Sequence, residues 1–290
     1  MLEQQIINGL MLGASYAMVA IGYTLIFGVL RLLHFAHGEV FMLGAFFGLH
    51  IVLAFAGANI YFAIAGAMIG TGIIGALIVL VAVRPVDNKY PLAPLISTIG
   101  VTIVIQNLAI TIFGGSLVSF PARINPELYQ IGDLTISSVQ IFILVVALVL
   151  MFSMWYLIEK TKIGRAIRAT SESHEIASLL GVNVNFIVLF VFVLASCLAG
   201  AAGVLDGVKN SNVSPFMGLE VAVKALVCML LGGLGNIFGA LVAGFLLGTV
   251  EILSSAYLGS GLRDFLTFVI LITILLFRPT GLFGTRVVRD

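Results

Sequence analysis

Charged residues are scarce in this chain, and their scarcity excludes an ordinary soluble fold. They make up 9% of the 290 residues, whereas 61% are hydrophobic; a typical globular domain carries roughly 25% charged residues. The net charge of +1 is spread over several loops, so we expect no basic face for nucleic acid. The composition therefore predicts a polytopic membrane protein.

Motifs for metals, nucleotides and disulfides are also missing. The two cysteines, Cys197 and Cys228, lie inside apolar runs, which disfavours a zinc site or a disulfide framework. The four histidines form no HExxH motif, and no lysine follows a glycine as a phosphate-binding loop requires. We therefore expect no enzymatic site in this chain, no metal, and no cofactor of its own.

Long apolar stretches dominate what is present. Most are about twenty residues long, which suits helices that cross a hydrocarbon core of about 30 Å. Nine such segments are predicted at 6–30, 40–56, 60–83, 92–113, 138–158, 185–205, 219–231, 237–256 and 262–277. Eight is the rival count, because the second and seventh could be broken or re-entrant helices, which need a cover of protein or a wet cavity. The predicted fold class is all-α, a transmembrane helical bundle of eight or nine spans forming one domain, 1–290.

Small residues recur at four-residue spacing within these segments. The glycine pairs are Gly9 with Gly13, Gly44 with Gly48, Gly66 with Gly70, Gly203 with Gly207, Gly235 with Gly239, and Gly244 with Gly248. Such pairs let helix backbones approach closely in lipid, so we expect them to hold the bundle together. No internal sequence repeat is recognisable.

One central segment, 159–184, breaks the apolar pattern with a cluster of basic residues. Short loops rich in lysine and arginine stay in the cytoplasm, so this loop is predicted to be cytoplasmic. The basic residues behind this orientation, including those of the tail and of the loop near residue 86, are Lys160, Lys162, Arg165, Arg168, Arg278, Arg286, Arg289, Arg84 and Lys89. The tail is therefore also predicted inside. The amino terminus then lies outside if the second segment crosses separately.

The second half of this loop has the pattern of a short separate helix. Ser171 or Ser173 suits the N-cap, Glu172 and Glu175 would lie in the first turn, and Gly181 suits the stop. A helix this short is marginal alone in water, so it must rest on something.

An apolar ridge on this helix is the candidate contact surface. Ile176, Leu179 and Leu180 share one face, and His174, Glu175 and Ser178 lie on another. The ridge could rest on the membrane interface or in a groove of a soluble partner.

Four polar residues near or within apolar spans are candidates for a transport pathway or gate. They are His37, Glu39, Glu220 and Lys224. Intramembrane charge is costly and often functional. The plainer interpretation is that His37 and Glu39 are interfacial or capping residues, and that Glu220 and Lys224, one turn apart, form an internal ion pair.

Three further charged residues are predicted to be peripheral. Glu251 lies near the outer end of its predicted span, where it would face water. Arg263 and Asp264 are expected to cap the last helix outside.

Four separated stretches resemble one family of membrane proteins. They are NGLMLGASYAMVAIGYTLIFGVLRLLHFAHGEVFMLGAF (8–46), GRAIRATSESHEIASLLGVNV (164–184), GGLGNIFGALVAGFLLGTVE (232–251) and RPTGLFG (278–284). Together they resemble the permease subunits of bacterial ABC importers, in particular the branched-chain amino acid permease family for high-affinity leucine, isoleucine and valine uptake. His34 departs from the asparagine found in many relatives.

The resemblance implies both a function and a set of partners. The chain would be the multi-pass inner-membrane permease of an ATP-driven importer, with a second related permease, two cytoplasmic ATPases that bind the ATP, and a periplasmic binding protein. The loop residues that would couple to the ATPases are Ser171, Glu172, Ser173, His174, Glu175, Ile176, Ala177, Leu179, Leu180 and Gly181.

Other functions remain open at this stage. The same family includes permeases for urea, short amides and other small solutes. An ion-coupled secondary transporter would use intramembrane carboxylates such as Glu39, Glu220 and Glu251 without a docking loop. A scaffold subunit would need only the packing glycines.

Overall fold

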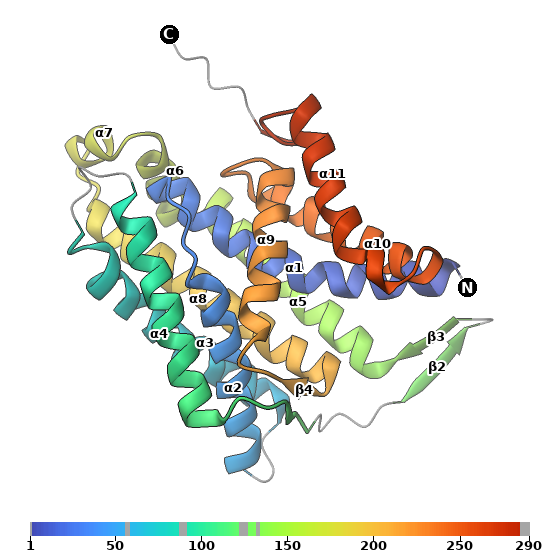
Figure 1. Cartoon of the computed structure of the whole chain (residues 1–290). Helices are drawn as coiled ribbons and strands as arrows, with labels where there is room; N and C mark the ends of the chain where they lie inside the picture. Colours follow the sequence, from blue (N-terminus) through green and yellow to red (C-terminus); the bar gives the residue numbers. More distant parts are fainter. Residues whose placement is uncertain (1, 56–58, 87–91, 122–126, 132–133, 285–290) are drawn as a thin grey trace.

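The protein is a helical membrane bundle with two small strand pairs at one end (Figure 1). The computed structural model describes residues 2–55, 59–86, 92–121, 127–131 and 134–284. The long helices are α1 (Leu2–Leu30), α2 (His37–Ala54), α3 (Ile60–Ile78, continued by the π-helical turn Val79–Val83), α4 (Ala93–Phe113), α5 (Ser138–Lys160), α8 (Val184–Asn210) and α10 (Ile237–Tyr257). The shorter helices are α6 (Lys162–Glu172), α7 (His174–Leu179), α9 (Met217–Gly232), the 3-10 turn Ser260–Leu262 and α11 (Arg263–Phe277). The antiparallel pairs join β1 (Val118–Ser119) to β4 (Asn212–Val213) and β2 (Leu128–Ile131) to β3 (Leu134–Ser137).

Each of the nine predicted apolar segments forms a helix, so the helical fold class is confirmed. Seven of the described helices are long and apolar enough to span a membrane. The other two, α9 and α11, have 16 and 15 residues. The seventh predicted segment, one of the two doubtful ones, thus corresponds to α9, which falls below spanning length.

The amino-terminal helix α1 forms the centre of the bundle, against α10 and α8. From Gly9 to Ile26 most of its residues are buried. The glycine spacing explains this close fit. A Cβ at Gly13 would lie 2.7 Å from the Cα of Phe245, and one at Gly244 would lie 2.6 Å from the Cα of Ala17. The predicted packing role of these glycines is confirmed between α1 and α10.

We expect Gly248→Ala to destabilise the bundle. A Cβ at Gly248 would overlap the backbone of Gly13, which cannot rotate away as a side chain can. Overpacking of this kind costs about 1–3 kcal/mol. Gly100→Ala in α4 is the matched control, because no atom lies within 4 Å of its added Cβ. Thermal unfolding of the detergent-solubilised protein measures both, and equal midpoints would contradict the prediction.

The helices form an inverted structural repeat that the sequence does not reveal. Helices α1, α2, α3 and α4 correspond in that order to α8, α9, α10 and α11. The contact of α1 with α10 then corresponds to that of α8 with α3, and the contact of α2 with α8 corresponds to that of α9 with α1. The helices α1 and α8 run in opposite directions between the two ends of the bundle. The only described non-glycine residues with positive φ, Arg31 (53°) and Ser211 (55°), directly follow α1 and α8. The repeat is therefore a feature of the helix packing, while the expectation that the sequence carries no recognisable repeat is unaffected.

The second apolar segment is entered through backbone that is not helical. The chain leaves α1 at Leu30 and runs through 31–36 before α2 begins at His37. His37 lies against Gly22 and its ring meets Tyr23 edge-on at 4.8 Å, so α2 starts about 12 Å below the end of α1 at 1.5 Å per residue. Ala36 and His37 are fully buried, which is the protein cover that irregular backbone needs inside a membrane.

The two ends of the bundle differ in what they carry. One end has α6 and α7, and the other has the amino terminus and the β2–β3 hairpin (Figure 1). Tail residues lie at the α7 end. The Leu282 amide donates to the Leu231 carbonyl, next to the turn between α9 and α10. That turn lies close to Gly28 at the end of α1. Arg84 also lies there, donating to the Asn185 carbonyl. The central loop and the described tail thus share one end, as expected; Lys89, Arg286 and Arg289 lie outside the described residues.

Candidate functional site

The central loop folds into two short helices. Thr161 caps α6, its hydroxyl accepting from the Gly164 amide at 3.1 Å. Ser173 caps α7, its hydroxyl accepting from the Ile176 amide at 3.3 Å. Of the two predicted caps, Ser173 is therefore correct. Glu172 is the last residue of α6, not part of the first turn of α7, because Ser173 adopts an extended backbone between the two helices.

The stop of α7 is confirmed. Gly181 has φ of +83°, a left-handed conformation that favours glycine. Its amide donates to the Ser178 carbonyl, and the Val182 amide donates to the Ala177 carbonyl. These bonds satisfy carbonyls at the end of the helix.

The apolar ridge of α7 points away from the bundle. Ile176, Leu179 and Leu180 are 61%, 81% and 74% exposed. Ala177 alone on this helix is buried, at 1% exposure, and anchors it to the chain beneath. Three large apolar side chains on one short rigid turn form a surface that another molecule can cover.

Two polar contacts fasten this loop to the end of α1. The His174 Nε2 lies 2.7 Å from the Val29 carbonyl oxygen. The Arg31 guanidinium donates to the carbonyls of Ser171 and Glu172, each at 3.4 Å. The last turn of α1 is thus bonded to α7, and the start of the non-helical segment 31–36 is bonded to the end of α6.

The predicted pathway residues His37 and Glu39 lie in the core. They are 0% and 1% exposed, so the interpretation that they are interfacial is wrong. The cause is the broken entry of α2, which carries the helix start inside the bundle. There Gly38 meets Gly218 at the start of α9, and a Cβ on Gly38 would lie 2.5 Å from the Gly218 carbonyl oxygen. The structure thus brings Glu39 beside the first turn of α9.

Lys224 is the centre of a charge cluster. Its ammonium pairs with Glu220 at 3.7 Å, which confirms the predicted pairing, although the Glu220 side chain is 67% exposed, and also with Asp264 at 3.0 Å. Its most buried partner is Glu251, whose side chain is fully buried and also pairs with Arg263. Helices α9, α10 and α11 are therefore connected through charge inside the bundle.

The prediction that Glu251 faces water is therefore wrong, whereas Arg263 and Asp264 begin the last helix as predicted, and the Asp264 side chain is 69% exposed. Glu251 has no exposed surface. Arg263 reaches it from α11 and also donates to the Tyr16 hydroxyl of α1 at 3.4 Å. Position along the chain does not reveal this cluster, because its members come from helices joined only by tertiary packing.

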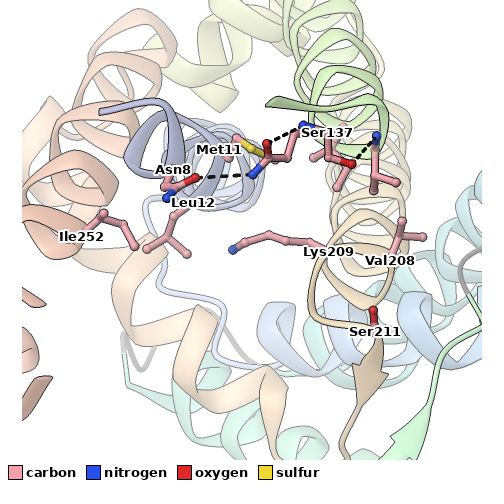
Figure 2. A pocket seen from close by; sticks show the side chains of 11 residues that line it. Asn8, Met11, Leu12, Ser137, Val208, Lys209, Ser211 and Ile252 are labelled. Carbon is pink, nitrogen blue, oxygen red and sulfur yellow. Dashed lines mark hydrogen bonds between the residues drawn. The ribbon is translucent and has the colours of Figure 1, made fainter. Parts of the chain in front are cut away.

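Two cavities with mixed polar and apolar walls lie at the end opposite α7. The first, of about 500 Å³, lies between α1, α5 and α8, and Figure 2 shows Lys209 extending into it from α8. The second, of about 540 Å³, shares Leu12, Lys209 and Ile252 with the first and adds Asp206 and Arg263. Asp206 and Lys209 pair at 3.8 Å. The second cavity also reaches the start of α9, whose entry is broken because the preceding residues 211–216 are not helical.

Comparison with known proteins identifies the family. The family model described as the permease component of branched-chain amino acid transport systems matches residues 5–275. The chain is 36% identical over 293 residues to the high-affinity branched-chain amino acid transport system permease protein LivH of Escherichia coli (strain K12), covering 97% of this chain and 95% of LivH. The corresponding protein BraD of Pseudomonas aeruginosa shares the same identity and coverage.

A more distant relative is also similar. The D-allose transport system permease protein AlsC of Escherichia coli (strain K12) is 26% identical over 170 residues, or 57% of this chain and 51% of AlsC. The match to the branched-chain permeases runs through every helix described above, including the loop with α6 and α7. The chain belongs to the branched-chain amino acid transport system permease family.

Proposed function

We propose that this chain is the permease subunit of an ATP-driven importer that moves branched-chain or related small amino acids across the bacterial inner membrane. The observation that carries the proposal is the exposed ridge of α7, held at one end of a bundle that belongs to a permease family. Residues 1–290 would act as one transmembrane domain, with 159–184 as the coupling loop.

The ridge is the proposed docking surface for two cytoplasmic ATPases. Fully burying a leucine or isoleucine side chain contributes about 1.5–3 kcal/mol, so Ile176, Leu179 and Leu180 could supply much of a stable contact. The polar residues of the coupling segment would flank this contact. ATP would be bound by those partners, and the permease itself would need no cofactor.

The proposed force path runs from the loop into the bundle. A closing ATPase pair would push α7, and the contacts of His174 and Arg31 would pass that push to the end of α1 and to segment 31–36. That segment leads into α2 and to Glu39. A short rigid element transmits force only while its apolar face stays seated in the partner.

The outer face of the bundle supports a second permease as partner. Helix α4 is mostly exposed, yet it carries Asn107 and Thr111 on its exposed surface. Each donates to a carbonyl one turn earlier in α4, and their remaining amide and hydroxyl oxygens would accept hydrogen bonds from a related subunit that covers this face. Lipid would cover the apolar remainder.

The proposed orientation has the central loop and the tail in the cytoplasm and the amino terminus outside. The basic residues of the loop support it. The two cavities at the opposite end would then face the periplasm, where a binding protein delivers its solute.

Reconstitution of the complete importer tests this function. With the second permease, the ATPases and the binding protein in liposomes, we expect uptake of leucine, isoleucine and valine to require ATP and the binding protein. Uptake of urea or a short amide instead would favour the other permeases of this family. Uptake driven by a proton or sodium gradient without ATP would replace the proposal with a secondary transporter.

A further inference from the structure

A small pocket lies where the starts of α2 and α9 meet, and its chemistry suits one part of an amino acid. Its volume is about 60 Å³. Side chains from α1, α2 and α9 line it, among them Tyr23, Glu39, Leu219, Ala222, Val223 and Leu226. Phe35 and Thr102 of α4 complete the lining, so the polar groups of the wall are one carboxylate, one phenol and one hydroxyl.

Glu39 is the charged group of this pocket. The residue is 1% exposed, and its Oε2 is buried without a hydrogen-bond partner among the described residues. Within the same described part of the chain it forms no ion pair. A buried carboxylate in apolar surroundings is costly unless a cation or hydrogen-bond donors approach it. The pocket is thus built to favour a positively charged group.

The two helix starts give the same place a complementary charge. Gly38 and Gly218 allow the backbones to touch, since a Cβ on Gly218 would lie 2.7 Å from the Gly38 carbonyl oxygen and 3.0 Å from Glu39 Oε2. Helix starts carry free amide groups and a partial positive charge, which stabilises a carboxylate. A buried acid beside a helix start therefore offers partners to both ends of a zwitterion.

We propose that Glu39 receives the α-ammonium group of the transported amino acid at this pocket, with the first turn of α9 beside its carboxylate. About 60 Å³ equals roughly two water molecules, enough for an ammonium head but not for a whole leucine. Leu219 and Val223 are 56% and 40% exposed at the rim, where an aliphatic side chain can lie. The assignment rests on the proposed function and names the group of the substrate that this chain contacts.

A purely structural role for Glu39 makes a different prediction. If Glu39 only joined α2 to the start of α9, glutamine would keep the size and hydrogen-bonding capacity of the side chain and preserve transport. If Glu39 binds an ammonium group, removing its negative charge weakens substrate binding even when the fold is unchanged.

The test compares Glu39→Gln, Glu39→Asp and Glu3→Gln in the reconstituted importer. We expect Glu39→Gln to lower leucine uptake about tenfold or more while ATP hydrolysis stimulated by the loaded binding protein continues. Glu39→Asp should recover part of the uptake. Glu3 is the matched control, because it is also a first-turn glutamate but is exposed at the start of α1.

A second pair of variants decides the matter if Glu39→Gln fails to assemble with its partners. Val223→Lys places a competing ammonium at the rim, and Val223→Met adds similar length without charge. Because Val223 is exposed, both should fold. We expect lysine to lower uptake far more than methionine does.

The outcomes separate this inference from the proposed function. Normal uptake by Glu39→Gln, or equal uptake by the two Val223 variants, would overturn the role of Glu39 alone. If the unaltered importer shows no ATP-driven amino-acid uptake, the proposed function itself fails.

Discussion

Leu179→Asp and Leu180→Asp are each expected to lower ATP-driven uptake about a hundredfold, which corresponds to about 3 kcal/mol. Both side chains are exposed in this chain, at 81% and 74%, so a charge there meets water and leaves the bundle unstrained. In the assembled importer the same charge would have to enter an apolar groove without a partner. The loss should therefore appear in assembly and transport, not in folding.

Three measurements on each variant decide this prediction. Thermal unfolding of the isolated permease should be unchanged, co-purification of the ATPases should fall, and uptake in liposomes should be lost. Ser178→Asp is the matched control, because it adds the same charge to the same helix on the side away from the ridge. Normal uptake by both leucine variants would remove α7 as the docking element.

Glu251→Ala is expected to destabilise the protein by about 3 kcal/mol, at the lower end of the range for breaking a buried ion pair. The change leaves Lys224, whose side chain is 7% exposed, without its most buried partner. The loss is limited because Asp264 and Glu220 still approach Lys224, although both are about two-thirds exposed. Arg263 also loses its contact with Glu251.

Replacing both charges separates pairing from burial. Lys224→Met combined with Glu251→Leu should recover most of the lost stability, because the two apolar side chains need no counter-charge and Arg263 can turn to Asp264. Thermal unfolding in detergent is the measurement. Glu159→Ala serves as the exposed control, since the pair of Glu159 with Arg168 at 3.6 Å is about half exposed and contributes about 1 kcal/mol or less. A midpoint for Glu251→Ala equal to that of this control would contradict the prediction.

Local patterns predicted the structure of the central loop well. The cap at Ser173, the ridge of Ile176, Leu179 and Leu180, and the stop at Gly181 all depend on neighbours a few residues apart, which a single sequence records. Helix α6 was not predicted, although Thr161 gave a usable N-cap three residues before Gly164.

Long-range features could not be predicted in the same way. From its position in the sequence Glu251 is predicted to be peripheral. It is instead buried beside Lys224 of α9 and Arg263 of α11, which pair with it. The burial of Glu39 depends on where segment 31–36 runs, and no periodicity records that path. Near their starts, both α2 and α9 have a glycine followed closely by Glu-Val, at Gly38 and Gly218. This similarity is too short to reveal the repeat from the sequence.

The broken entries of α2 and α9 have a consequence for how a solute could cross. From their meeting point at Gly38 and Gly218, α2 runs toward the amino-terminal end of the bundle and α9 toward the α7 end. Rocking about that point would widen the approach on one side of the membrane while narrowing it on the other. Transporters built from inverted repeats achieve alternating access in this manner. A solute held near Glu39 would then face only one compartment at a time.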